Sequence, residues 1–427
     1  MKIKIKNASV ITNNDRDEVL HGAQIHIDDE LIAFAGMQGD APEFDAQREV
    51  DAAGKIVMPG FFNTHTHVPM TLFRCYADDL ALHEWLHEKI FPAEDKLTDE
   101  MVYWASLAAM CEFAAAGVVG FNDMYSNCNA ILDATKKSGI RMLLGRGIVS
   151  FTEEAADIRI KEALELHEEF HGVDRVLVCM SPHAQYTVNE KTLKRVAGLA
   201  QGQGMRVHAH VSETQKEHED CIRETGKTPV ELFQSLGLLD VPFIGAHCVW
   251  VTDHDIELLA KHNATVASCP RSNLKLASGI APLKKFMNSG VNVALGTDSA
   301  ASNNKLSIMS EMDYANLLQK GVTGDPQVIP AKQAIRLATL NGAQAMGFKS
   351  GKIEAGWNAD LIMIDNGSVR FSPTYDIAAS VVYAANESDI CMTIVGGDII
   401  YENGKCLFAD VEEIRDRLES YAKTIKA

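Results

Sequence analysis

The chain lacks the sequence features that mark membrane, secreted and redox proteins. No apolar run approaches the roughly 20 residues that a bilayer span requires. The opening MKIKIKNASV alternates polar and apolar residues, which is typical of a strand and not of a signal peptide. The nine cysteines include no C-x-x-C pair, and most have apolar neighbours, as in VLVCM. We therefore expect reduced cysteines in a cytoplasmic protein with no membrane partner.

Basic residues and prolines are also scarce. Lysine and arginine total 40 against 58 acidic residues, so the formal net charge is -18 at pH 7. Such an excess of negative charge argues against nucleic acid or an anionic membrane as a partner. Only 12 of the 427 residues are proline, and 46% are hydrophobic, which is enough for one large domain and a small one.

Short β-rich runs alternate with helical patterns from about residue 56 onward. The runs are residues 55–67, 117–124, 141–149, 175–183, 206–213, 243–250, 264–273 and 291–299. Stretches between them, such as EKTLKRVAGLAQGQG, have apolar residues at helical spacing and end in Gly or Asn. Eight such units predict an α/β fold of the (β/α)₈ TIM-like barrel type. The main alternative, a doubly wound open sheet, is disfavoured because no G-x-G-x-x-G follows the first run.

The two ends of the chain have a different pattern from the middle. Residues 1–55 and 351–427 contain strands and turns, among them an Asn403-Gly404 hairpin signal, and neither end alone can close a core. We predict that both ends form one small composite β-sandwich domain beside a barrel of residues 56–350. A charged helix at about 410–425 is expected to end the chain.

Polar side chains stand where the predicted barrel strands end, which is where barrel enzymes carry their chemistry. Five of the 15 histidines lie at these ends, together with one glutamate and one aspartate: His65, His67, His183, His210, Glu213, His247 and Asp298. So many equivalent positions indicate a common site.

The first run supplies two of these histidines on one face. His65 and His67 are two residues apart on a strand and therefore point to the same side. His210 and Asp298 would complete a metal site of three imidazoles and one carboxylate, which suits zinc, with iron(II) or manganese as alternatives. His208 shares a face with His210 but lies two residues deeper, and we interpret it as a packed, hydrogen-bonded histidine.

Several motifs together resemble the amidohydrolase superfamily, and most of all its S-adenosylhomocysteine/5'-methylthioadenosine deaminases. They are PGFFNTHTHVPMTLFRCYADDL, HAHVSET, GAHCVW, GTDSAASNN and GKIEAGWNADLIMID, which span nearly the whole chain. The resemblance implies that His65, His67, His210 and Asp298 hold one divalent ion per subunit, commonly zinc. Relatives with two metals use a lysine at the end of strand four, where this chain has RVLVCMSPH. We therefore expect a mononuclear site and no hydantoinase- or dihydroorotase-like ring opening.

The resemblance also implies the reaction, a hydrolytic deamination of an adenosine-type nucleoside to its inosine analogue and ammonia. The metal lowers the pKa of its water to about 7, and the water attacks the carbon that carries the amine. Glu213, in the family's H-x-x-E pattern, would bring a proton to the ring nitrogen. His247 and Asp298 would orient the water and take its proton.

Substrate contacts are implied in the same way. Glu94 would bind the ribose hydroxyls, and His183 would contact the purine or ribose. Arg146 and Arg159 would receive the carboxylate of S-adenosylhomocysteine, for which a guanidinium is well suited, although each could instead be a surface ion-pair partner. Glu213 and Asp298 would contact the reacting base. The resemblance further implies a homo-oligomer.

The stretch HEWLH, residues 83–87, fits the zinc-protease pattern H-E-x-x-H. However, Trp85, Leu86 and Ile90 form an apolar stripe, Pro92 limits the helix, and no G-x-x-H follows. We interpret the match as accidental and the segment as part of the wall over the substrate.

Two other functions stay open. The first is a deaminase or chlorohydrolase of the same barrel family that acts on guanine, 8-oxoguanine, a pterin or a triazine. Glu94 and the two arginines argue against it, because these compounds have no ribose or carboxylate. The second is a non-catalytic, amidohydrolase-like binding protein, which the complete set of metal ligands argues against.

Overall fold

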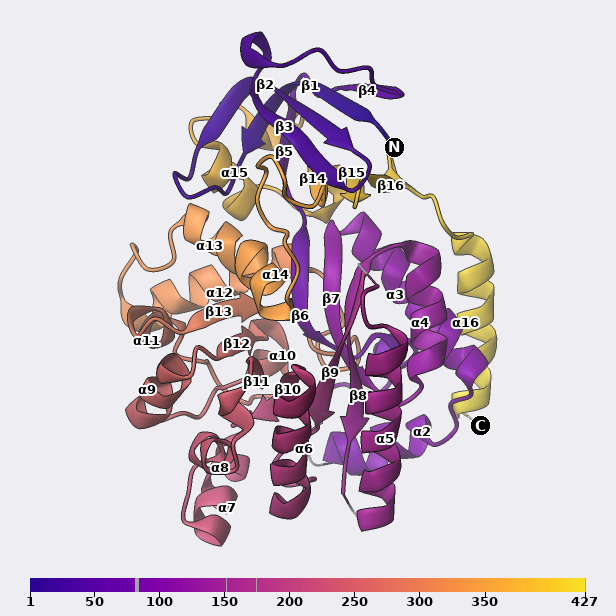
Figure 1. Cartoon of the computed structure of the whole chain (residues 1–427), viewed down its shortest axis with the longest axis vertical. Helices are drawn as coiled ribbons and strands as arrows, with labels where there is room; N and C mark the ends of the chain where they lie inside the picture. The colour runs from indigo at the N-terminus through magenta and orange to yellow at the C-terminus, as the bar shows by residue number, and fades with distance from the viewer. Residues whose placement is uncertain (81–83, 151, 174, 427) are drawn as a thin grey trace.

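The computed structural model describes residues 1–80, 84–150, 152–173 and 175–426. Within these residues the strands form two sheets, a parallel barrel and a mixed sheet, which lies at the top of Figure 1. No helix in the described ranges is both long and apolar enough to cross a membrane.

The barrel contains eight parallel strands that follow one another in sequence order. They are β6 (Phe61–Thr66), β7 (Val118–Tyr125), β8 (Arg141–Ile148), β9 (Val176–Pro182), β10 (Arg206–Val211), β11 (Phe243–His247), β12 (Thr265–Ser268) and β13 (Asn292–Leu295). Seven of them lie within the predicted runs, and β7 extends one residue beyond its run of 117–124. The predicted (β/α)₈ architecture is therefore confirmed.

The barrel is nearly closed where β13 meets β6. Thr64 Oγ1 donates to Leu295 O at 2.7 Å, and the Asp298 N–H donates to His65 O at 2.9 Å. A Cβ on Gly296 would lie 2.9 Å from three atoms of His65, so only glycine allows this approach. The closure carries the end of β13 to the histidines of β6.

Helices surround the barrel and connect its strands (Figure 1). They are α2 (Phe91–Glu94), α3 (Asp99–Ala115), α4 (Cys128–Ser138), α5 (Glu153–Glu169), α6 (Glu190–Gln203), α7 (Gln215–Thr225), α8 (Pro229–Ser235), α9 (Asp253–Lys261), α10 (Pro270–Lys275), α11 (Leu283–Asn288), α12 (Ile308–Thr323), α13 (Ala331–Ala338) and α14 (Leu340–Met346). A π-helical segment, Trp85–Ile90, precedes α2. The side chain of Thr152 caps α5, and those of Asn189 and Thr214 cap α6 and α7, which explains why these helices begin there.

Both ends of the chain build the mixed sheet, as predicted. Its strands are β1 (Ile3–Ile11), β2 (Val19–Asp28), β3 (Leu31–Met37), β4 (Arg48–Asp51), β5 (Lys55–Pro59), β14 (Leu361–Asp365), β15 (Ile390–Val395), β16 (Asp398–Glu402) and β17 (Lys405–Cys406). Irregular registers bend it, and apolar side chains from both ends of the chain share one core.

The chain passes from the mixed sheet to the barrel at Gly60. The strand β5 pairs with β1 and β14 and so belongs to the mixed sheet, whereas β6 begins at Phe61 in the barrel. The predicted domain boundaries at residues 55/56 and 350/351 stay a prediction.

The C-terminal segment follows the expected pattern. Asn403 and Gly404 have φ values of 47° and 83° and join β16 to β17 in a tight hairpin. The helix α15 (Ile377–Tyr383) precedes β15. After the hairpin, the helix α16 (Val411–Lys426) ends the described chain beside α3 and α4.

Candidate active site and metal centre

A cleft of about 580 Å³ opens at the carboxyl ends of the barrel strands. Its lining includes nearly every residue that the sequence singled out: His67, Glu94, Arg146, Arg159, His183, His210, Glu213, His247 and Asp298. His65 is fully buried beside them. The structure therefore brings all the predicted site residues to one place.

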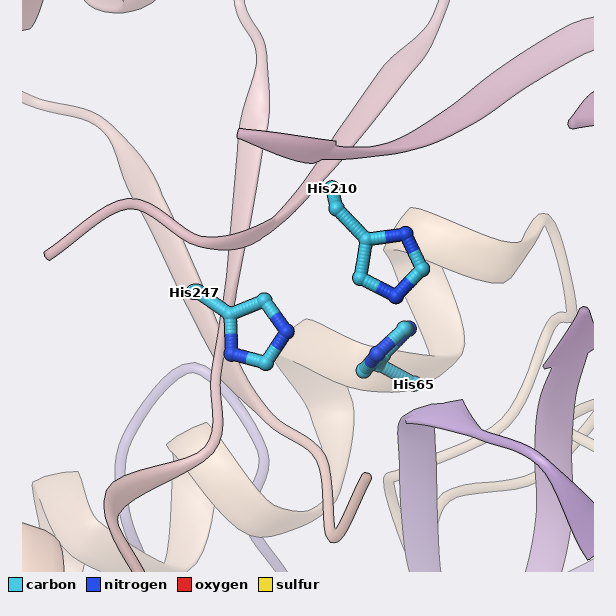
Figure 2. A group of neighbouring side chains, drawn as sticks. All are labelled: His65, His210 and His247. Carbon is cyan, nitrogen blue, oxygen red and sulfur yellow. The ribbon is translucent and has the colours of Figure 1, made fainter. Parts of the chain in front are cut away.

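Four histidines and one aspartate form the base of this cleft. His65 Nε2 and His67 Nε2 lie 3.6 and 3.4 Å from Asp298 Oδ1. Figure 2 shows the rings of His65, His210 and His247 turned toward one another. These side chains make two groups that share His65. One group adds His67 and Asp298, and the other adds His210 and His247. Within each group the potential ligand atoms lie within 4.8 Å of one another.

Backbone carbonyls fix the orientation of two of these rings. His67 Nδ1 lies 2.7 Å from Met124 O, and His210 Nδ1 lies 2.9 Å from His183 O. A carbonyl oxygen can only accept, so both Nδ1 atoms carry the hydrogen, and each Nε2 keeps a lone pair for a metal.

His65 provides the test of whether a metal fits. Its Nε2 is buried and has no hydrogen-bond partner among the described residues. A buried polar atom without a partner is costly, and a metal ion would satisfy it. Imidazole nitrogens together with one carboxylate are the donors that a divalent transition metal prefers, so the residues present fit such an ion.

Asp298 is held as a carboxylate by its surroundings. Its Oδ2 accepts from Ser272 Oγ at 2.6 Å and Ser302 Oγ at 2.7 Å. Burial alone would raise the pKa of Asp298, but the neighbouring histidines, His65 first, lower the pKa well below its usual range. The residue has a φ of 59°, a left-handed conformation that aspartate tolerates better than most residues.

Glu213 lies beside His247 at the edge of the metal-binding groups. The closest carboxylate oxygen of Glu213 is 3.8 Å from His247 Nε2, and Ser278 Oγ donates to the other oxygen at 3.4 Å. Burial raises the pKa of Glu213, while His247 counteracts this rise. A carboxyl group with a raised pKa holds a proton more readily than a solvated one, which suits a role in proton transfer.

Sequence reasoning missed three kinds of supporting residue. Asn273 Oδ1 lies 2.8 Å from His247 Nδ1 and orients that ring. Glu217 accepts the backbone N–H groups of Ser212 and Glu213 at 2.9 and 2.7 Å, and so fixes the turn in which Ser212 has a φ of 48°. The serines at Asp298 are the third kind. Asn273 was visible as the polar end of its run, but nothing in the sequence indicated its partner.

The residues predicted to contact substrate lie farther up the cleft. Tyr125 donates its hydroxyl to Glu94 Oε1 at 2.6 Å, and burial raises the pKa of Glu94. His183 Nδ1 lies 2.9 Å from Thr187 Oγ1. Both side chains belong to the lining of the cleft. They are therefore available to a polar ligand.

The two arginines share one region of the cleft. Arg146 Nε donates to Glu162 at 2.7 Å, whereas Arg159 donates to the backbone oxygens of Ala155 and Val149 at 3.2 and 3.4 Å. Burial lowers the pKa of Arg159, and the positive charge of Arg146 lowers it further. Two guanidinium groups close to one carboxylate leave an excess of positive charge, which favours an anion.

His87, the histidine of the HEWLH match that the structure describes, belongs to neither metal-binding group. His83 lies outside the described residues. Trp85, Leu86 and His87 of this match line the cleft together with Ile90, which follows it, and His87 packs edge-on against Phe91. This placement agrees with the interpretation of the segment as part of the wall.

Comparison with known proteins agrees with this geometry. The model of the amidohydrolase family matches residues 56–400. A 5-methylthioadenosine/S-adenosylhomocysteine deaminase of Moorella thermoacetica is 42% identical over 97% of both chains, and one of Acetivibrio thermocellus is 40% identical over the full length of both. The crystal structure of an adenosine deaminase from Xanthomonas campestris with bound zinc superposes with a TM-score of 0.96 at 31% identity, over 99% of this chain and 98% of that one. The chain therefore belongs to the amidohydrolase family.

Proposed function

We propose that this enzyme is a metal-dependent deaminase that hydrolyses the amino group of an adenosine-type nucleoside. Its substrates would be 5'-methylthioadenosine and S-adenosylhomocysteine, with adenosine as a third candidate. The observation that carries the proposal is one cleft with the groups for hydrolysis at its base and Glu94, Arg146 and Arg159 farther along its wall. The relatives that are about 40% identical support it by name.

The histidine and aspartate groups fit a divalent metal, and we propose that it is one zinc ion held by His65, His67, His210 and Asp298. When bound, the ion supplies a water that is nucleophilic at neutral pH. The zinc-bound adenosine deaminase supports zinc over iron(II) or manganese. The absence of a lysine at the end of β9 supports a single ion.

Glu213 would carry the proton that the purine ring needs. Attack at the carbon that bears the amine places negative charge on the adjacent ring nitrogen, and that nitrogen must be protonated as the attack proceeds. Glu213 has a buried carboxyl group with a raised pKa, which suits this transfer. His247 and Asp298 would orient the water and take its proton, which then passes to the amino group so that this group leaves as ammonia.

The polar groups along the wall match the rest of a nucleoside. The Glu94 carboxyl group can accept hydrogen bonds from two ribose hydroxyls while Tyr125 holds it in place. His183 would contact the purine or the ribose. Arg146 and Arg159 would bind a free amino-acid carboxylate, which only S-adenosylhomocysteine carries among the three nucleosides.

The bare-ring substrates are the second candidate. Guanine, 8-oxoguanine, a pterin or a triazine would use the base of the cleft but would leave Glu94 and both arginines without a ligand. These three side chains line the cleft and have polar atoms that a nucleoside or an amino-acid carboxylate could bind. The nucleoside proposal accounts for these side chains and the bare-ring alternative does not.

The arginine variants test the substrate class. A hydrogen bond to a charged group contributes roughly 1.5–3 kcal/mol, which corresponds to about 10- to 150-fold in catalytic efficiency. Arg159→Met should lower kcat/KM for S-adenosylhomocysteine by about this factor and change kcat/KM for adenosine by only a few-fold, and Arg146→Met should do the same. Ammonia release measured on all three nucleosides checks both expectations.

Arg195 offers a matched control, since it forms an exposed ion pair with Asp157 and does not line the cleft. Arg195→Met should leave all three efficiencies unchanged. An equal loss on every nucleoside in the Arg146 and Arg159 variants would assign these arginines to the fold. Unchanged efficiencies would remove the carboxylate contact, leave Glu94 and His183 as the only support for a nucleoside, and reopen the case for a bare-ring substrate.

The homo-oligomer and the cytoplasmic location stay predictions. The small-molecule nucleoside is the one partner that the named relatives support.

A further inference from the structure

A second buried histidine contacts the metal-binding group from behind. His208 Nε2 lies 2.9 Å from His65 Nδ1, and the two rings meet edge to face, with centroids 5.0 Å apart and planes at 72°. Both side chains are completely buried, and such burial favours uncharged imidazole. The contact is therefore a hydrogen bond between two neutral rings, one of which must donate and the other accept.

The metal decides which ring donates. If His65 gives its Nε2 to the ion, its single hydrogen must be on Nδ1, so His208 Nε2 must be the acceptor. His67 and His210 face backbone carbonyls, which can only accept and so fix those rings outright. His65 differs, because its partner is an imidazole that could either donate or accept. The orientation of His65 therefore depends on the side chain at position 208.

His208 itself cannot replace a ligand in this arrangement. It lies on β10, two residues before His210, and it is absent from the metal-capable groups found among the described residues. Its other nitrogen, Nδ1, is buried without a hydrogen-bond partner in the described chain. A buried N–H without a partner is costly. A leucine at position 208 could fill the same space without this cost. The presence of an imidazole here, despite this cost, is explained by the hydrogen-bond acceptor that it offers to His65.

We propose that His208 is a positioning residue of the metal centre. It accepts the hydrogen bond of His65 Nδ1–H, holds His65 in the form whose Nε2 faces the ion, and thereby raises the affinity for the metal. This inference rests on the metal site of the proposed function.

Zinc affinity of the metal-free protein, measured by competition with a chromophoric chelator, tests the proposal. His208→Leu removes the acceptor and should weaken zinc binding about 10- to 100-fold, the usual effect of losing an outer partner of a metal ligand. His208→Gln places an amide oxygen near the position of Nε2 and should stay within about threefold of the unmodified protein. His26, another completely buried histidine, lies in the mixed sheet, so His26→Leu controls for the loss of a buried imidazole and should leave zinc affinity unchanged.

Nitrogen-15 NMR of the histidine rings provides a second readout that does not require the leucine variant to fold. In the zinc-loaded protein, His65 should carry its hydrogen on Nδ1, and His208 Nε2 should be unprotonated. A His208 Nε2–H in that spectrum would overturn the proposal. So would equal zinc affinities in the leucine and glutamine variants, whether both were reduced or both unchanged. Failure of the deaminase proposal would look different, namely zinc binding that depends on His208 but no ammonia from any nucleoside.

Discussion

Replacement of Glu213 by glutamine is expected to lower kcat by on the order of 10²- to 10⁴-fold. Glutamine has nearly the same shape and can still face His247 and accept from Ser278, but it cannot carry a proton. The buried position of Glu213 at the base of the cleft makes it the natural proton carrier for the ring nitrogen. Steady-state ammonia release measures the loss, and elemental analysis should find an unchanged metal content.

Glu219 on α7 offers the control for this variant, because it is an exposed glutamate six residues further along the chain. Glu219→Gln should have normal turnover. If Glu213→Gln also turned over normally, Glu213 would have no part in proton transfer. If it lost its metal instead, the residue would belong to the metal centre.

Removal of the metal is expected to abolish deamination. Without an ion, the cleft has no group that makes water a nucleophile at neutral pH. Dialysis against a chelator should bring ammonia release to background, and zinc should restore it in proportion to the ion bound, up to one per chain. Magnesium should not restore activity, because it prefers six oxygen ligands.

The number of ions tests the ligand assignment. Four side chains, His65, His67, His210 and Asp298, suffice for one ion, and β9 ends without the lysine that a second ion would need. Two tightly held ions per active chain would contradict the mononuclear site. Full activity in a metal-free sample would contradict the assignment altogether.

The sequence predicted the barrel because each unit repeats the same pattern. A short, buried strand gives an apolar run, and the helix that follows begins at a capping residue. It predicted the site because the carboxyl ends of parallel strands meet at one end of a barrel. His65, His183 and His247 are far apart in the chain, but each lies at the carboxyl end of a strand or within one residue of it. Their position along the strand was therefore enough to group them.

The supporting contacts could not be predicted in the same way. Asn273 reaches His247 from α10, and Glu217 turns back to the N–H groups of Ser212 and Glu213. These contacts depend on loop conformations that no periodicity describes. His208 illustrates the same limit, since the sequence indicated a packed, hydrogen-bonded histidine but not that its partner is His65.

The strand β5 shows how one continuous run can divide. Residues 55–67 look like a single strand with its polar end, but Gly60 separates β5 in the mixed sheet from β6 in the barrel. A Cβ at Gly60 would lie 2.2 Å from the side chain of Val119, so the chain can pass this point only as glycine. The pattern of hydrophobic residues does not change there, because both strands are buried.

The substrate class can be tested by ammonia release from the zinc-loaded enzyme, with S-adenosylhomocysteine, 5'-methylthioadenosine and adenosine compared with guanine, a pterin and a triazine. We predict one ammonia and one inosine-type product for each nucleoside consumed, with negligible release from the bare rings. Efficient release from a bare ring with none from the nucleosides would contradict the assignment of a nucleoside substrate.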